Sequence, residues 1–190
     1  MNTLPAILAS FLFRSIKVED IRLALQTFIP SPSQTPGRLN LFQFKTFKFL
    51  VDFAHNPAGL QLLCDFVNKF NAYPRVGIIS GTGDRRDEDI REIGRISAKN
   101  FDEIIIRQDK NMRGRTADEI INLLVEGINE RKTNDIPITI IPKERDAIIH
   151  AYKNAKPGSF ITIMCDVIPD ALAFIKNLKE EEENVDSATA

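Results

Sequence analysis

From Lys45 onward the sequence alternates short apolar runs with amphipathic stretches, and this alternation constrains the fold more than any other feature. A helix between two strands lets the strands lie parallel, joined by a right-handed crossover. The predicted parallel strands are 47–54, 76–80, 103–107, 138–141 and 160–165. A further run at 39–44 is expected to pair with the first strand as an antiparallel edge hairpin. The sequence therefore predicts an α/β fold, a Rossmann-like, mostly parallel sheet with flanking helices.

Helices are predicted from the spacing of apolar residues. One apolar face repeats at three- and four-residue steps and is expected to face the sheet; it consists of Leu60, Leu63, Cys64, Val67 and Phe70. Thr116 and Glu119 have the spacing of a capping box, which predicts that a helix begins there. Further helices are expected over 18–28, 87–100, 143–155 and 168–179.

The two ends of the chain differ from this middle part. Prolines and small polar residues at 30–37 cannot sustain regular structure, so this stretch is predicted to be a linker. The acidic end, 180–190, has almost no apolar content and is predicted to be a disordered tail. The apolar run at 4–13 lacks a basic n-region and is too short to span a bilayer. We therefore expect a helical segment at 1–29 and one α/β domain at 38–179.

Charge and cysteine content narrow the functional class. The chain has 25 Lys and Arg against 26 Asp and Glu, so no global basic field argues for nucleic acid or an anionic membrane as a partner. Its 190 residues suffice for one α/β core with a small appendage. Cys64 and Cys165 lie in apolar surroundings, which favours reduced core residues and a cytoplasmic chain. Whether the chain forms a homo-oligomer stays open.

The junction after the first parallel strand carries an acid, an imidazole and an amide. In open α/β sheets, ligands bind beyond the carboxyl ends of the strands. Asp52 can hold the hydroxyls of a ribose there or only cap a turn, and His55 can contact a phosphate or be structural. Asn56 is expected to cap the next helix, with Pro57 in its first position. These residues form a candidate nucleotide site.

A glycine-containing loop follows the next strand. Gly81 and Gly83 can let backbone N–H groups approach an anion, or they can simply make a tight turn. Asp84 fits a solvated helix start, whereas Arg85 and Arg86 fit a clamp on phosphate or carboxylate better. This is not a Walker sequence, because no Gly-Lys-Ser/Thr follows at the required spacing.

A second charged loop runs from Arg107 to Arg115, after the strand at 103–107. The planar fork of an arginine such as Arg113 binds carboxylate with two hydrogen bonds, and Asp109 can hold a guanidinium or an amine. The alternative is surface charge without a role. Asp166, after the last strand, is a further candidate at the same edge of the sheet.

Four segments together resemble a known family. They are Gln34-Thr35-Pro36-Gly37-Arg38, Asp52-Phe53-Ala54-His55-Asn56-Pro57, the run from Gly81 to Arg91, and Met112-Arg113-Gly114-Arg115. The second is similar to the signature at the start of the C-terminal domain of the Mur ligase superfamily, which includes folylpolyglutamate and cyanophycin synthetases. The last two segments favour the cyanophycin synthetases over ordinary cell-wall ligases. The resemblance spans about residues 15 to 178.

The resemblance implies an ATP-dependent carbon–nitrogen ligase that adds arginine to aspartate side chains, with ATP and Mg²⁺ as cofactors. It implies that residues 1–29 are the helical tail of a central ATPase domain whose P-loop core is missing from this chain. It places Asp52, His55 and Asn56 at the nucleotide. It places Asp109, Arg113 and Arg115 at the amino-acid substrate. It assigns no catalytic residue and no metal ligand to this chain.

The implied partners are ATP, arginine or a cyanophycin-like peptide, and the central ATPase domain of the same or a separate chain. The fragment alone is expected to be inactive. Alternatives are a noncatalytic module that complements a separate ATPase half, another Mur-type or folylpolyglutamate-type ligase domain, or a truncated gene product. The ligase interpretation further expects Asp52, Arg85 or Arg86, and Arg113 to meet in one cleft.

Overall fold

The structure, a computed structural model, describes residues 4–13, 16–28, 31–131 and 135–187, without the side chains of 185–187. Contacts divide the chain into two units, Met1–Pro30 and Ser31–Ala190. Residues 31–37 of the predicted linker form turns within the larger unit. They are held there because the backbone N–H of Phe53 donates to the Gly37 carbonyl at 2.9 Å.

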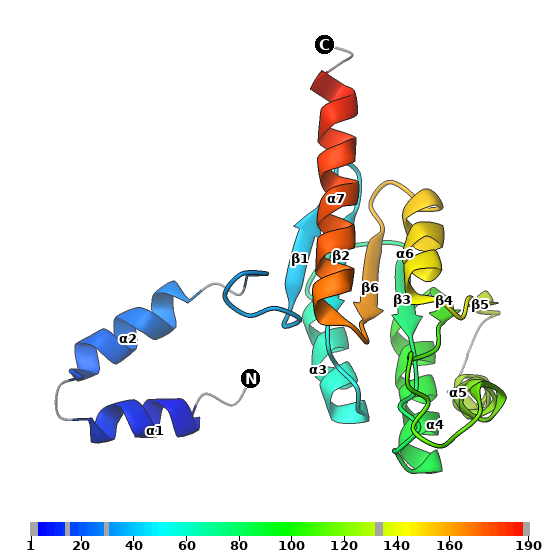
Figure 1. The fold of residues 1–190 in the computed structure, drawn as a ribbon, viewed down its shortest axis with the longest axis horizontal. Coiled ribbons are helices and arrows are strands. Elements are labelled where there is room, and N and C mark those ends of the chain that lie inside the picture. The colour runs from blue at the N-terminus through cyan, green and yellow to red at the C-terminus, as the bar shows by residue number, and fades with distance from the viewer. Residues whose placement is uncertain (1–3, 14–15, 29–30, 132–134, 188–190) are drawn as a thin grey trace. The chain divides into compact units, whose positions relative to one another are not determined.

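A six-stranded sheet forms the centre of the larger unit, in the order β1-β2-β6-β3-β4-β5 (Figure 1). The strands are β1 (Asn40–Gln43), β2 (Lys48–Asp52), β3 (Arg75–Ile79), β4 (Glu103–Ile106), β5 (Ile138–Ile140) and β6 (Phe160–Met164). β1 pairs antiparallel with β2, and the other neighbouring strands pair in parallel. The predicted strands, the edge hairpin and the α/β class are therefore confirmed.

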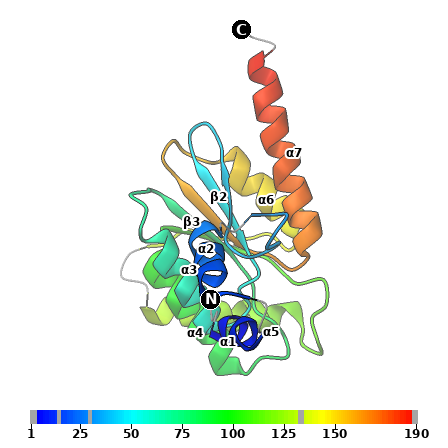
Figure 2. The ribbon, with the colours of Figure 1, turned by 90° about the vertical axis from the view of Figure 1, so that its left-hand side faces the viewer.

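Helices cover both faces of this sheet (Figure 2). The helices are α3 (Pro57–Val67), α4 (Asp87–Asn100), α5 (Ala117–Arg131), α6 (Glu144–Lys153) and α7 (Ile168–Ser187). α3, α4 and α5 share one hydrophobic core with strand residues such as Leu50 and Ile79. α6 and α7 share the second core with alternate residues such as Val51 and Ile78. The side-chain alternation of the strands thus divides the apolar residues between two layers of helices.

Two helix starts have the geometry that the sequence predicts. The Asn56 side-chain oxygen accepts the N–H of Gly59 at 2.8 Å, with Pro57 in the first position of α3. Before α5, the Thr116 hydroxyl oxygen accepts the N–H of Glu119 at 3.3 Å. The Glu119 carboxylate in turn accepts the N–H of Thr116 at 2.7 Å, which completes the capping box.

α7 corrects one prediction, because it continues to Ser187 although disorder was expected from residue 180. Ion pairs one helical turn apart, Lys176–Glu180 at 3.4 Å and Lys179–Glu183 at 3.5 Å, support the extension. The backbone N–H of Lys45 also donates to the Glu182 carboxylate at 3.1 Å. Residues 188–190 lie outside the described residues.

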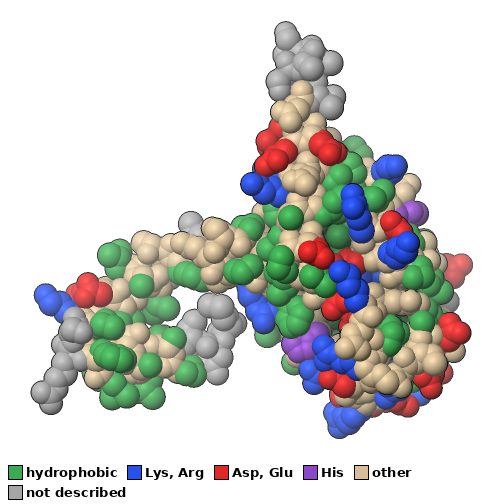
Figure 3. All heavy atoms as spheres, in the orientation of Figure 1, with side chains coloured by type: hydrophobic (Ala, Val, Ile, Leu, Met, Phe, Trp, Pro, Cys, Tyr) green, Lys and Arg blue, Asp and Glu red, His purple; other side chains and the backbone are tan. Residues whose placement is uncertain are grey.

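The smaller unit consists of α1 (Leu4–Leu12) and α2 (Val18–Thr27), as the sequence predicts for 18–28. Neither helix buries a residue, and large apolar side chains lie at the surface of this unit (Figure 3). Leu4 is 72% exposed and Leu12 is 71% exposed. A hollow of about 630 Å³ between the helices is lined mainly by apolar residues, including Ile7 and Ile21.

Two further observations concern the whole described chain. Cys64 and Cys165 are free and buried, and burial raises the pKa of each thiol to about 12. Among the helices that the structure describes, none combines the length and the apolar character needed to cross a bilayer.

Candidate functional site

The candidate site lies at the carboxyl edge of the parallel strands. Asp52 pairs with Met164, and Ile79 pairs with Ile106, so the four strands β2, β6, β3 and β4 end nearly level. The loops that follow therefore leave the sheet side by side. The position agrees with the edge at which open α/β sheets bind ligands.

Asp52 is buried, and both of its carboxylate oxygens accept backbone hydrogen bonds. Oδ1 accepts the N–H of Ala54 and Oδ2 accepts the N–H of Leu39, each at 2.8 Å. Burial raises the pKa of Asp52, while these two hydrogen bonds and nearby Arg38 act in the opposite direction. Asp52 therefore joins the Gly37–Asn40 segment to β2. This agrees with the alternative, stated from the sequence, that Asp52 caps a turn. The role at a ribose stays a prediction.

His55 and Asn56 also have local partners. The Nδ1 atom of His55 lies 3.0 Å from the Phe53 carbonyl oxygen, and its ring centroid lies 4.8 Å from that of Phe53. The oxygen of Asn56 caps α3. The His55 Nε2 and the Asn56 Nδ2 have no hydrogen-bond partner among the described residues and are the atoms of this pair left for a ligand.

The loop predicted to bind an anion and the loop predicted to bind the substrate are joined by direct contacts. Arg115 donates from Nε to the Gly83 carbonyl at 2.9 Å and from Nη2 to the Arg85 carbonyl at 3.0 Å. Its Nη1 also lies 2.7 Å from the Asp87 carboxylate. A Cβ atom at Gly83 would overlap the Met112 carbonyl oxygen, so glycine permits this close approach. The Ser80–Asp87 loop and the Asp109–Arg115 loop thus form one substructure.

The arginines of this substructure differ in how completely they are paired. Arg113 pairs with Asp84 at 2.7 Å, and the 81% exposed Arg86 side chain pairs with Asp89 at 2.8 Å. The Nε of Arg85 is buried and has no hydrogen-bond partner. A buried unpartnered donor is rare and calls for an explanation, such as a ligand that the structure does not contain. Arg85 is therefore the strongest anion-binding candidate in the Gly81–Arg86 segment.

A buried ionic cluster beside these loops was not anticipated from the sequence. The Arg107 side chain is only 1% exposed, and its Nη1 lies 2.7 Å from Asp109 Oδ1. Its Nε lies 3.3 Å from Glu144 Oε2, and both Nε and Nη2 donate to the Met164 carbonyl. Burial raises the pKa of Glu144, and Arg107 opposes this shift. The cluster joins the ends of β4 and β6 to the start of α6.

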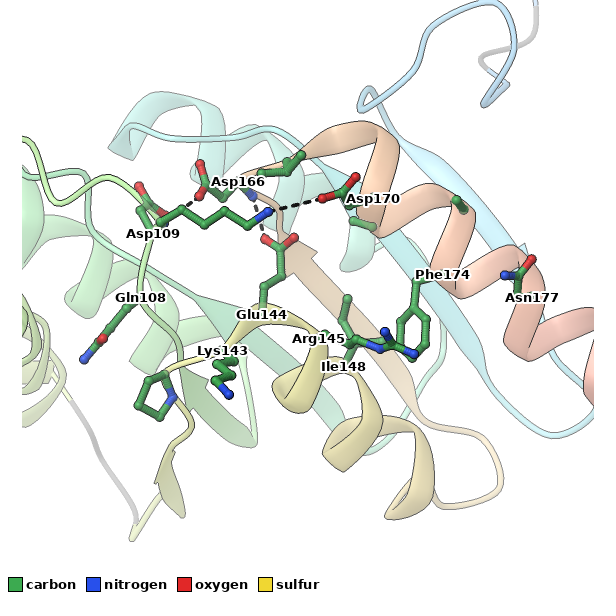
Figure 4. Close-up of a pocket in the computed structure, with 15 residues that line it drawn as sticks. Gln108, Asp109, Lys143, Glu144, Arg145, Ile148, Asp166, Asp170, Phe174 and Asn177 are labelled. Atoms are coloured by element: carbon green, nitrogen blue, oxygen red, sulfur yellow. Dashed lines mark hydrogen bonds and ion pairs between the residues drawn. The ribbon is translucent and has the colours of Figure 1, made fainter.

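A cleft of about 840 Å³ opens between α6 and α7, next to this cluster, and we call it the α6–α7 cleft (Figure 4). One end is lined by acidic side chains together with Lys110; they are Asp109, Glu144, Asp166 and Asp170. The other end is lined by Arg145, which lies over the Phe174 ring at 4.6 Å, and by Asn177. Of the predicted substrate residues, only Asp109 lines this cleft.

The structure joins some of the predicted site residues by direct contacts. Arg113 and Arg115 contact the Gly81–Arg86 segment directly. In the part of the chain that the structure describes, no hydrogen bond or ion pair joins Asp52 to Arg85, Arg86 or Arg113. All of them leave the same edge of the sheet, yet none of them lines the α6–α7 cleft.

Comparison with known sequences identifies the family. Residues 37–166 match the profile of the Mur ligase, glutamate ligase domain. The cyanophycin synthetase of Nostoc sp. is 37% identical over 191 residues, which are 99% of this chain and 21% of that protein. The cyanophycin synthetase of Synechocystis sp. is 38% identical over 178 residues, 94% of this chain and 20% of that protein. The chain thus spans about a fifth of the length of these curated relatives.

Solved structures share the fold. Escherichia coli FolC in complex with ADP superposes with a TM-score of 0.64 at 15% identity, over 87% of this chain and 36% of that one. A bifunctional folylpolyglutamate synthase/dihydrofolate synthase with Mn, AMPPNP and L-glutamate bound gives a TM-score of 0.63 at 16% identity, over 85% and 35%. The matching profile covers residues 37–166, more than half of the chain, so the chain belongs to the Mur ligase family as a C-terminal, glutamate ligase domain.

Proposed function

We propose that this chain is the lid and amino-acid-recognition domain of a cyanophycin synthetase-like, ATP-dependent amide ligase that adds arginine to aspartate side chains. The observation that carries the proposal is the locked pair of loops at the carboxyl edge of the sheet. There Arg113 and Arg115 contact the segment in which the buried Nε of Arg85 has no partner. An acidic substrate carboxylate or a phosphate supplies the charge that such a donor lacks.

In this proposal each group of residues binds one part of the substrates. Asp52, His55 and Asn56 lie nearest the nucleotide, and the Gly81–Arg86 segment binds its phosphates or the activated carboxylate. Asp109, Arg113 and Arg115 contact the incoming amino acid. Preorganised arginines stabilise the negative charge that develops during acyl transfer. Closure of a lid over the site excludes water from a reactive acyl intermediate.

The cofactors of the intact ligase are proposed to be ATP and Mg²⁺. Related solved structures contain ADP, or AMPPNP and Mn. The unpartnered Arg85 Nε fits a phosphate of the nucleotide. Among the described residues, no group of three or more acidic, histidine or cysteine side chains has an arrangement that could hold a metal ion. When bound, ATP supplies the phosphoryl group that activates the acceptor carboxylate.

One experiment tests whether this chain needs a separate ATPase core for activity. The chain is incubated with ATP, Mg²⁺, arginine and a cyanophycin primer, and phosphate release is measured. We expect no release from the chain alone and arginine incorporation when an ATPase core is co-expressed with it. Turnover by the chain alone would refute the proposal that the core lies elsewhere. Failure of co-expression to give any incorporation would refute the ligase role.

A noncatalytic module that complements a separate ATPase half is the second candidate. The exposed apolar side chains of α1 and α2 favour it, because two helices without a buried residue need a further surface to pack against. Binding of a separately expressed core without any incorporation would support this reading. Incorporation of glutamate in place of arginine would instead indicate a folylpolyglutamate-type domain.

We place the protein in the cytoplasm on the basis of its buried free cysteines.

A further inference from the structure

We propose that Arg107 is a positioning residue, whose guanidinium holds Asp109 and, through Glu144, the Asp166 loop in the geometry that receives the cationic end of the amino-acid substrate. The proposal rests on the proposed function, in which Asp109 contacts that substrate. It adds two residues, Arg107 and Glu144, which have no role in the proposed function as stated above.

The first step concerns the orientation of the Asp109 carboxylate. Its Oδ1 accepts a hydrogen bond from Arg107 Nη1 at 2.7 Å and one from the Ser80 hydroxyl at 3.1 Å. No described group donates to Oδ2. Because Oδ1 is held from two sides and Asp109 lines the α6–α7 cleft, Oδ2 is the oxygen left for a ligand in that cleft (Figure 4). An amine or a guanidinium is the group that such an oxygen binds best.

The second step concerns the two other segments at this end of the cleft. Glu144 Oε2 forms an ion pair with Arg107, 3.3 Å from its Nε, and accepts a hydrogen bond from the backbone N–H of Asp166 at 2.6 Å. Asp166 Oδ2 then accepts the backbone N–H of Lys110 at 2.8 Å. One guanidinium therefore connects the loop after β4, the start of α6 and the loop after β6. These three segments form the acidic end of the α6–α7 cleft.

The third step concerns charge and chemistry. The carboxylates near this end are those of Asp109, Glu144, Asp166 and Asp170, and the cations are Arg107, Lys110 and Lys143, so an excess of negative charge remains. Buried ion clusters contribute little net stability, whereas their fixed geometry can specify one arrangement of the groups around them. A lysine has no planar fork and cannot serve Asp109, Glu144 and the Met164 carbonyl at once. The network is therefore suited to orienting a site.

The test uses four variants of the chain in the assembled ligase, meaning this chain together with its ATPase core. Arg107→Lys keeps the charge and removes the fork, and Glu144→Gln keeps an acceptor for the Asp166 N–H and removes the charge. Asp109→Asn removes the proposed contact itself. The matched control is Arg91→Lys, because Arg91 makes a single surface ion pair with Glu126 between α4 and α5.

We expect Arg107→Lys to raise the KM for arginine about tenfold and to leave the KM for ATP within about twofold, since the loss falls on one substrate. Glu144→Gln should give a smaller increase in the same direction. Asp109→Asn should raise the KM for arginine at least as much as Arg107→Lys. Arg91→Lys should match the wild type. In the chain alone, Arg107→Lys should also speed amide hydrogen exchange at Lys110 and Asp166, measured by NMR.

Each other outcome is decisive. If Asp109→Asn raises the KM for arginine and Arg107→Lys behaves like Arg91→Lys, the positioning role is overturned and the proposed function stands. If Asp109→Asn has no effect, the assignment of the substrate site itself fails. Should Arg107→Lys not fold, an unchanged KM for arginine in Glu144→Gln overturns the positioning role. If the assembled ligase is inactive, the proposed function fails. Independently of that result, unchanged amide hydrogen exchange at Asp166 in Arg107→Lys would show that Arg107 does not fix this end of the cleft.

Discussion

Arg113 and Asp84 form an ion pair between two loops, with Nη1 2.7 Å from Oδ2. Arg113 is a proposed contact of the amino-acid carboxylate, so Asp84 competes with that substrate for the same guanidinium. Arg113 also lowers the pKa of Asp84, chiefly through this hydrogen bond. The pair is therefore fully formed at neutral pH and is lost only as the pH falls through the lowered pKa.

We predict that Asp84→Asn lowers the KM for the amino-acid substrate in the assembled ligase. The effect should be about twofold to threefold, because exposed ion pairs are weak. The measurement is a comparison of KM values for arginine and ATP at neutral pH and low salt. Glu88→Gln is the control, since Glu88 pairs with Arg95 away from the substrate loop. A raised KM in Asp84→Asn would mean that the pair helps binding.

Alanine at Arg113 or Arg115 should weaken use of the amino acid more than use of ATP. The two variants should differ in stability, because Arg115 also holds two backbone carbonyls of the neighbouring loop, those of Gly83 and Arg85. Arg115→Ala is expected to lower the free energy of unfolding by about 1–3 kcal/mol, the usual cost of losing such hydrogen bonds. Steady-state kinetics and urea denaturation measure the two effects. Equal losses for both substrates would contradict the assignment.

Asp52→Ala is predicted to raise the concentration of ATP that the assembled ligase requires. The same change removes the acceptors for Leu39 and Ala54, so nucleotide affinity must be measured on folded protein. Asn40→Ala is the matched control, because Asn40 fastens the same segment by accepting the N–H of Gly37 at 2.6 Å. If both variants weaken ATP binding equally, Asp52 acts only through the fold.

The raised pKa of Asp52 leads us to predict that the free energy of unfolding depends on pH. Burial raises its pKa above the ordinary value of 3.8, so the folded state binds the proton more tightly than the unfolded state does. The contribution of Asp52 to the free energy of unfolding must then fall as the pH rises from that value through the raised pKa. Urea denaturation of the wild type and Asp52→Asn over this range checks the sign. The stability advantage of the wild type should shrink with rising pH, and a growing advantage would contradict the prediction.

Gly127→Ala should destabilise the protein although alanine favours helices. A Cβ atom at this position would overlap the Arg91 carbonyl oxygen of α4. Forcing α4 and α5 apart costs about 1–3 kcal/mol, which exceeds the gain in helix propensity. Thermal and urea unfolding measure the change. Asn122→Ala at an exposed position of α5 is the control and should change stability little.

Most of the fold could be predicted from the sequence because its signals are local. The strand at 160–165 and the helix starts at Asn56 and Thr116 follow from apolar runs and capping residues a few positions apart. The length of α7 could not be predicted from composition, since its acidic end is supported by ion pairs with lysines one turn earlier and by Lys45.

The site was less predictable because its contacts are not local in the sequence. Individual motif residues could be named, but their partners lie far away in the sequence. The guanidinium of Arg107 reaches the carbonyl of Met164, 57 positions later, and also Glu144. One available signal was the position of Glu144, shortly after the strand at 138–141 and at the start of a helix. That Arg107 is buried depends on the packing of β4 between β3 and β5, which no local pattern reports.

The contact between Gly83 and the Met112 carbonyl has a consequence for how such domains can diverge. Neither backbone can bulge there without displacing the other. An insertion or deletion in one loop therefore has to be matched by a compensating change in its neighbour, and the two loop lengths should be inherited as a pair.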